Sequence, residues 1–410
     1  MTDSVPERPS SRRAGTDHYL DHAATTPMLP QALDAWVAVA RDVGNPASVH
    51  AAGQRARALV EEGRARVAAS AGADPAEVVF TSGGTESVNT AIKGIHWWRD
   101  TAGDHPVIVL PEAEHRASEA AATWLAQRQG AELQRVPVDR AGRVDLDRLE
   151  RILDASGDRV SLVSLLAANN EVGTIQPVRQ VVRLAAAHGV PVHVDAVSAY
   201  GQIPVDLHGW GAAAVSVAAH KIGGPMGVGA LLLRRDVTPV PLLHGGGQER
   251  RVRSGTLDVP GIAAFGVAAE HAETTRTDRA RATAVLRDRL IAGIEREVPD
   301  AIVTGARGDE RLPGNVHAVF PGCEGDSLLF LLDAAGVRAS TGAACSAAIP
   351  QPSDVLRAMG FDAADARSAL RFTLGERTTA ADVDAVLAVL PEVVARARRA
   401  GMSARRPTRF

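Results

Sequence analysis

Short apolar runs alternate with longer amphipathic segments along most of this chain. Helical spacing of apolar residues is expected at 31–43 and 51–71, and strands at 78–80, 107–110, 161–166, 190–194 and 212–218. The strands recur about every 25 to 30 residues with helices between them. This alternation predicts an α/β protein with a mostly parallel, doubly wound sheet, in which ligands lie at the carboxyl ends of strands.

The pattern changes at about Glu273, where a long charged helix is expected to run towards Val298. Strand, helix and strand at 315–320, 327–335 and 368–374 then predict a smaller α+β domain. A chain of 410 residues exceeds what one core usually encloses, so two lobes are expected. The predicted organisation is a disordered leader (1–17), a large domain (29–272), a small domain (18–28 with 273–400) and a flexible tail (401–410).

The composition mainly argues against certain classes of partner, location and cross-link. A net charge of −3 with dispersed arginines gives no reason to expect nucleic-acid or membrane partners, and no apolar run has membrane-spanning length. The polar N-terminus lacks the apolar stretch of a signal peptide, so we expect a cytoplasmic protein. Two cysteines, Cys323 and Cys345, cannot form a disulfide framework, and each is expected to be a free thiol.

Two strand ends carry the first chemical signal. Asp195 ends the strand at 190–194, and Lys221 follows the strand at 212–218. A lysine can hold pyridoxal phosphate (PLP) as a Schiff base, and a carboxylate can keep its pyridine nitrogen protonated. Taken singly, an aspartate in the place of Asp195 is more often an N-cap or turn residue, and a lysine in the place of Lys221 is more often a solvated surface residue.

A glycine turn supplies the second signal. The strand at 78–80 runs into Thr81-Ser-Gly-Gly-Thr-Glu-Ser87 and then an apolar helix. Backbone amides at a helix N-terminus, freed of side-chain bulk at Gly83 and Gly84 and joined by the Thr85 hydroxyl, form an anion cradle suited to the phosphate of PLP. The sequence is neither a Walker A motif nor GxGxxG, so no nucleotide is indicated, and the turn could also be a plain connection.

Other polar residues follow further strands. His115 could stack on a cofactor ring or move protons, or could simply cap a helix. The segment 168–173 contains Asn-Asn, whose amides could bind a cofactor oxygen or serve a turn. Glycine-rich segments at 222–229 and 244–250 allow close approach to a ligand or a second subunit. Small side chains around Cys345 predict a mobile, reactive cysteine, whereas Cys323 is expected to be buried.

Taken together and in order, these motifs resemble a cysteine desulfurase of the class V, fold-type I PLP enzymes, the NifS/IscS-like group. The resemblance runs from Tyr19 to about Arg399 and implies a large domain with a seven-stranded, mostly parallel sheet. Its motifs are YLDHAATTP, GNPAS, VVFTSGGTES, EHRA, NNEVG, HVDA, HKIGGPMGVGAL, HGGGQERRVRSGT, TGAACS, PSDVLRAMG and RFTLG.

The resemblance implies a role for each matching residue. Lys221 would be the Schiff-base lysine, Asp195 the partner of the pyridine nitrogen, His115 the ring-stacking acid/base and Cys345 the nucleophile. Arg371 would bind the substrate carboxylate through its guanidinium. The remaining implied ligands of cofactor or substrate are Asn170, Gly84, Thr85, His220 and, from the other subunit of a homodimer, Thr256. No metal is implied.

Two positions depart from the family pattern. The family usually has Gln where this chain has Ser198, and Ser where it has Ala218. The first change removes a long donor to the phenolic oxygen of PLP and the second a phosphate hydroxyl. At about 1 kcal/mol per hydrogen bond, the pair would weaken PLP binding roughly tenfold or more.

The implied reaction converts L-cysteine to alanine and leaves a persulfide on Cys345 for an acceptor or scaffold protein. Attack by Cys345 requires its thiolate, for which His115 is a candidate base. The alternatives are a related PLP lyase or aminotransferase, such as a selenocysteine lyase, and a degenerate homologue that only binds partners. Iron–sulfur assembly, tRNA thiolation, DNA phosphorothioation and thio-cofactor synthesis remain open as pathways.

Overall fold

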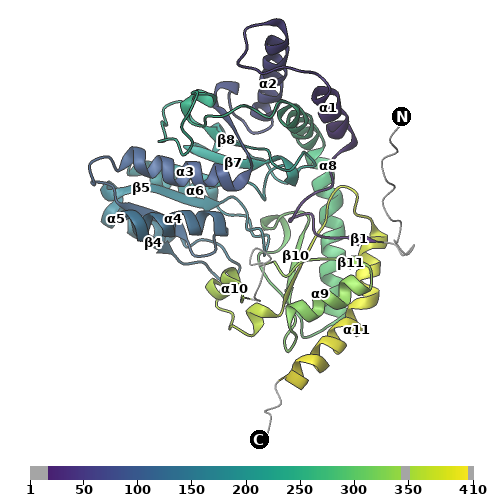
Figure 1. Ribbon diagram of the computed structural model, residues 1–410. Coiled ribbons are helices and arrows are strands. Elements are labelled where there is room, and N and C mark those ends of the chain that lie inside the picture. The colour runs from purple at the N-terminus through teal and green to yellow at the C-terminus, as the bar shows by residue number, and fades with distance from the viewer. Residues whose placement is uncertain (1–16, 343–350, 405–410) are drawn as a thin grey trace, which may run out of the picture.

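The computed structural model describes residues 17–342 and 351–404 (Figure 1). A seven-stranded sheet forms its larger lobe, with the strand order β2-β8-β7-β6-β5-β3-β4. The prediction of a mostly parallel sheet is confirmed, and the exception is β8, which runs antiparallel to both of its neighbours. The strands are β2 Val78–Thr81, β3 Val107–Pro111, β4 Glu132–Val136, β5 Val160–Leu166, β6 Val192–Asp195, β7 Ala214–Ala218 and β8 Gly229–Leu233.

Helices cover both faces of this sheet, because successive strand side chains point to opposite sides. Val79 faces the apolar layer under α3 and α4, whereas Val78 and Phe80 face the layer built with α2, α5, α6 and α8. All four residues of β2 are buried, as a sheet covered on both sides requires. The helices of this lobe are α1 Pro30–Ala40, α2 Ala51–Ala69, α3 Gly84–Arg99, α4 Arg116–Gln129, α5 Leu146–Ser156, α6 Val178–Ala187 and α7 Leu207–Trp210.

The second lobe has its own apolar core, which includes Leu20 near the start of the described chain. A three-stranded sheet in the order β12-β10-β9 packs with helices, and β1 pairs in parallel with β11. The predicted strand–helix–strand pattern is therefore found in this lobe. Its elements are β1 His18–Tyr19, β9 Ile302–Val303, β10 Asn315–Val319, α9 Gly325–Ala334, β11 Val337–Arg338, α10 Asp354–Ala358, β12 Ala369–Thr373 and α11 Ala380–Ala404.

One long helix joins the two cores. The prediction that a helix starts near Glu273 is wrong, because this helix starts at Val259. Helix α8 runs from Val259 to Glu297, and the Asp258 side chain caps it by accepting a hydrogen bond from the amide of Gly261. Residues 259–272 pack in the large lobe and residues 290–294 in the small one. The charged residues from 273 onwards therefore lie in the largely exposed middle of a continuous helix, not at its beginning.

Within the described residues, none of the helices combines the length and the apolar character needed to cross a membrane.

Candidate active site

Asp195 and Lys221 lie at the same edge of the central sheet. Asp195 is the last residue of β6, and Lys221 follows the parallel neighbour β7 by three residues. Asp195 is only 3% exposed, and its Oδ1 accepts a hydrogen bond from the amide of Val197 at 3.0 Å. Burial raises the pKa of Asp195, while the positive charges of His115 and Lys221 act to lower it. The carboxyl group is therefore buried and electrostatically coupled to both predicted partners.

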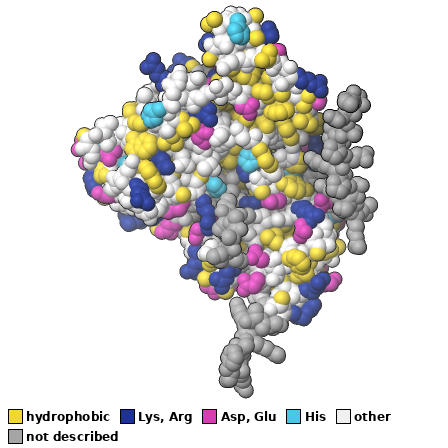
Figure 2. Space-filling view, in the orientation of Figure 1, with side chains coloured by type: hydrophobic (Ala, Val, Ile, Leu, Met, Phe, Trp, Pro, Cys, Tyr) yellow, Lys and Arg dark blue, Asp and Glu magenta, His cyan; other side chains and the backbone are white. Residues whose placement is uncertain are grey.

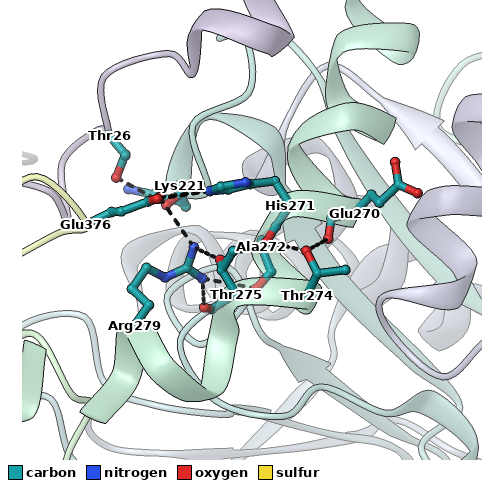
Figure 3. A network of polar contacts seen from close by, with 10 residues as sticks. Thr26, Lys221, Glu270, His271, Ala272, Thr274, Thr275, Arg279 and Glu376 are labelled. Carbon is teal, nitrogen blue, oxygen red and sulfur yellow. Dashed lines mark hydrogen bonds and ion pairs between the residues drawn. The ribbon is translucent and has the colours of Figure 1, made fainter. Parts of the chain in front are cut away.

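The side chain of Lys221 is held by the chain near the N-terminus. Its Nζ donates to the backbone carbonyls of Ala23 and Ala24, the latter at 3.0 Å. The hydroxyl of Thr26 in turn donates to the backbone carbonyl of Lys221 at 3.2 Å (Figure 3). These contacts place the amine in a half-buried position, so Lys221 is not a solvated surface lysine.

A charged network links α8 to the turn after β12 beside this lysine. Figure 3 shows Arg279 and His271 of α8 converging on Glu376. His271 Nε2 lies 2.9 Å from a Glu376 carboxylate oxygen, and Arg279 Nη1 lies 3.8 Å from the same group. Arg279 also donates to the carbonyl of Gly201, which lines the cavity around Lys221. The network therefore joins the two lobes at the wall of this cavity.

The predicted anion cradle is formed by the start of α3. Gly83 has a φ of 149°, which side chains disfavour, and the helix begins at Gly84. A Cβ atom on Gly84 would lie 2.6 Å from a methyl group of Val197, two residues after Asp195. The cradle thus touches the segment that leaves β6. The first-turn amides, including that of Thr85, have no acceptor within the helix and are suited to phosphate.

His115 and Asn169 have the capping and turn roles that the sequence allowed, and His115 and Asn170 also lie near Asp195 or Lys221. His115 caps α4, since its Nδ1 accepts from the amide of Ala117 at 3.1 Å, and it also lies close enough to lower the pKa of Asp195. Asn169 is the turn residue, because its Oδ1 accepts from the amides of Glu171 and Val172. Asn170 instead lines a cavity that it shares with Ser198 and Lys221.

Arg371 lies at the border of the same site. It is 4% exposed, and its Nη1 donates to the carbonyl of Asn170 at 2.9 Å. Its Nη2 forms an ion pair with Asp21 at 2.9 Å, while Nε has no partner among the described residues. No local sequence pattern predicts that Asp21 pairs with Arg371, because the two residues lie 350 positions apart; the only signal for Asp21 is its place in the YLDHAATTP motif.

The remaining predicted residues fall in three places. His220 lies beside Lys221, and burial together with the lysine's charge lowers its pKa to about 4, so the ring is neutral near pH 7. Thr256 is exposed and lines a different pocket, with Gln248 and Glu249. Cys345 lies outside the described residues. Cys323 is buried, as predicted, and burial raises the pKa of its thiol.

The donor set fits pyridoxal phosphate. A buried carboxylate suits a protonated pyridine nitrogen, and the Lys221 amine lies within electrostatic reach of it. The start of α3 packs against the segment that follows Asp195 and offers amides for a phosphate. Aldehyde, ring nitrogen and phosphate of one cofactor would thus each meet a matching group.

Comparison with known proteins adds three kinds of similarity. The family model described as "Aminotransferase class-V" matches residues 18–386. A Mycobacterium tuberculosis protein named "IscS-like cysteine desulfurase" is 51% identical over 94% of this chain and 98% of its own length. A solved "NifS-like protein" superimposes with a TM-score of 0.85 at 35% identity, covering 93% of this chain and all of that one. Another structure, titled "SspA in complex with cysteine", has a TM-score of 0.76 at 28% identity, with 88% and 100% covered.

Proposed function

This chain belongs to the aminotransferase class-V family and is a PLP-dependent cysteine desulfurase, and from this premise we propose that it transfers sulfur from L-cysteine, through a persulfide on Cys345, to an acceptor protein. The observation that carries the proposal is the buried carboxyl of Asp195 beside Lys221, at the edge where β6 and β7 end. We also propose that it works in the cytoplasm, in line with the free thiol of Cys323.

The cofactor, when bound, withdraws electrons from the substrate's α-carbon. Each chain residue then has a separate task. The Asp195 carboxylate would accept a hydrogen bond from the protonated ring nitrogen. The amine of Lys221 would hold the aldehyde and, once freed, carry the α-proton. His115, at the start of α4, would stack on the ring. His220, with its pKa lowered to about 4, offers a neutral imidazole beside the phosphate.

Substrate recognition falls to Arg371 and Asn170, which lie in direct contact. The guanidinium of Arg371 is fixed from one side by Asp21 and retains an unpartnered, buried Nε among the described residues. That N–H is available to the carboxylate of cysteine, and a charge-assisted hydrogen bond is the strong kind. Asn170 lines the cavity beside Lys221 and orients the same substrate.

The sulfur atom moves to Cys345. Its thiolate attacks the sulfur of bound cysteine, the carbon–sulfur bond breaks with its electrons going to carbon, and a proton returned to that carbon completes alanine. The persulfide sulfur on Cys345 is then open to attack by a thiol of the acceptor protein. His115 is the proposed base for the thiol proton.

The protein is proposed to work as a homodimer. Helix α1 and the loop after it expose apolar side chains, with Leu33 48% and Val43 80% exposed, and Figure 2 shows hydrophobic side chains gathered over α1. Thr256 is exposed and lies in another pocket than Lys221. Both observations support a dimer in which Thr256 reaches the phosphate in the partner subunit.

Borohydride reduction tests the cofactor site. The purified protein is expected to be yellow, and reduction should fix PLP irreversibly on a peptide that contains Lys221. Lys221→Ala should abolish both the fixation and the release of alanine from cysteine, whereas Lys93→Ala is the matched control. A colourless wild-type protein that takes up no added PLP would refute the proposal.

A further inference from the structure

Three consecutive residues of the segment 244–256 have a backbone conformation that side chains disfavour. Glu249, Arg250 and Arg251 have φ angles of +47°, +57° and +64°. In this left-handed region the Cβ atom crowds the residue's own backbone, so a run of three non-glycine residues requires support from its surroundings. The same segment carries Thr256 a few residues later.

The support is a buried ion pair. Arg64 of α2 contacts both carboxylate oxygens of Glu249, at 2.7 and 2.9 Å, and the two side chains are 10% and 2% exposed. Glu249 also accepts the amide of Phe80 at 2.7 Å, and Arg64 donates to the carbonyl of Val78 at 2.8 Å. Three hydrogen bonds thus fasten the left-handed turn to α2 and to the edge strand β2, and the fourth ties Arg64 to the same strand.

Two further side-chain hydrogen bonds support the chain between the left-handed turn and Thr256. The side chain of Gln248 accepts the amide of Gly255 at 3.0 Å. Arg253 Nε donates to Glu86 at 2.9 Å, and Glu86 stands in the first turn of α3, next to the phosphate cradle. The turn, the cradle helix and the residue just before Thr256 are therefore connected through side-chain hydrogen bonds, while Thr256 itself is exposed.

We propose that Arg64 and Glu249 are positioning residues for the cofactor site of the partner subunit: their ion pair holds the left-handed turn that presents Thr256. This inference rests on the proposed function, in which Thr256 crosses the dimer to the phosphate of PLP. Neither residue touches the cofactor. Loss of the ion pair lets the turn relax to negative φ values and withdraws the Thr256 hydroxyl.

The test uses Glu249→Gln in the full-length holoenzyme and measures the rate of PLP release after dilution into an apo-protein trap. PLP release is expected to be at least about tenfold faster than in the wild type. This is the change expected when one hydrogen bond to the cofactor is lost. Arg251→Gly added to Glu249→Gln should recover part of the loss, because glycine adopts a positive φ without strain. A purely structural ion pair would not be rescued in this way.

Glu62→Gln is the control, since it removes a surface ion pair with Arg66 on the same helix and should release PLP at the wild-type rate. If Glu249→Gln gives no folded dimer, Arg64→Lys replaces it, with faster release expected because a lysine cannot contact both oxygens. A folded, dimeric variant that releases PLP at the wild-type rate overturns the inference. A monomeric wild type, or Thr256→Ala with unchanged release, overturns the proposed function instead.

Discussion

At the scale of single residues, burial sets the chemistry around Lys221. It raises the pKa of Asp195 and lowers that of His220 to about 4. The raised pKa favours the neutral, protonated form of Asp195. The nearby His115 and Lys221 act against this effect and favour the charged carboxylate. A protonated cofactor ring would add a positive charge next to Asp195, so binding of PLP is expected to favour the ionised carboxylate.

Cys345 separates the desulfurase from a lyase that needs no cysteine. Cys345→Ala should still bind PLP and cysteine, because Lys221, Asp195 and Arg371 are unchanged, yet alanine release should fall at least about a thousand-fold. Mass spectrometry of wild-type enzyme treated with cysteine should find one added sulfur on the Cys345 peptide. Cys323→Ala is the control, expected to leave turnover largely intact. Undiminished alanine release by Cys345→Ala would favour the lyase.

His193 makes the folded state sensitive to acid. It is fully buried in β6, between Ser164 and Ser216 at 2.8 Å each, and burial lowers its pKa from 6.5 to about 3. Between these values the unfolded chain binds a proton that the folded chain does not, so the free energy of unfolding falls as pH falls. His193→Gln should reduce this slope by up to about 1.4 kcal/mol per pH unit.

Denaturant unfolding at several pH values across that window measures the slope. His105→Gln, in the loop before β3, is the control and should keep the wild-type slope. An acid slope of His193→Gln equal to that of the wild type would contradict the prediction.

At the scale of elements, two glycines decide how closely α2 and α8 cross. A Cβ atom on Gly266 would lie 2.7 Å from the Cα of Gly63, and one on Gly63 would lie 2.7 Å from the carbonyl oxygen of Ile262. Neither contact can be relieved by a side-chain rotation alone. Gly266→Ala should therefore lower the free energy of unfolding by about 1 to 3 kcal/mol, despite the better helix propensity of alanine.

The denaturation midpoint measures this change. Ala282→Ser, at an exposed position of the same helix, should stay within about 0.5 kcal/mol of the wild type. If Gly266→Ala were as stable as the wild type, α2 and α8 could move apart without loss of free energy of unfolding, and the prediction would be wrong.

Elements and site residues differed in how far the sequence could predict them. Buried strands were predictable because continuous apolar runs ending in polar residues mark them, as at Asp195 and Lys221. The start of α8 was not predictable from the sequence. Its first residues are small and apolar whereas its middle is charged, so the change in composition suggested a boundary inside what is one continuous helix. The pairs Asp21–Arg371 and Arg64–Glu249 join distant segments, and no local pattern encodes such contacts.

At the scale of the whole molecule, the proposed dimer predicts complementation between two defective chains. Lys221→Ala and Thr256→Ala subunits are combined in one mixed dimer. If Thr256 crosses the interface, one of the two sites receives both intact residues, so PLP retention and alanine release should approach half of the wild-type values. If Thr256 serves its own subunit, neither site is intact.

Both homodimeric variants serve as controls, and Thr256→Ala alone should bind PLP roughly ten- to a hundred-fold more weakly, the range expected for a charge-assisted hydrogen bond. Mixed dimers no better than the Thr256→Ala homodimer would contradict the crossed arrangement.

Helix α8 ties the two cores into one cooperative unit. With 39 residues it is about 58 Å long, and its two ends are buried in different cores while its middle lies on the surface. A break in that middle would leave each core with only part of a helix, because both ends depend on the same continuous hydrogen-bond ladder. The slowest-exchanging amides of the two lobes should accordingly open together, in a single global event, although the lobes are built around separate sheets.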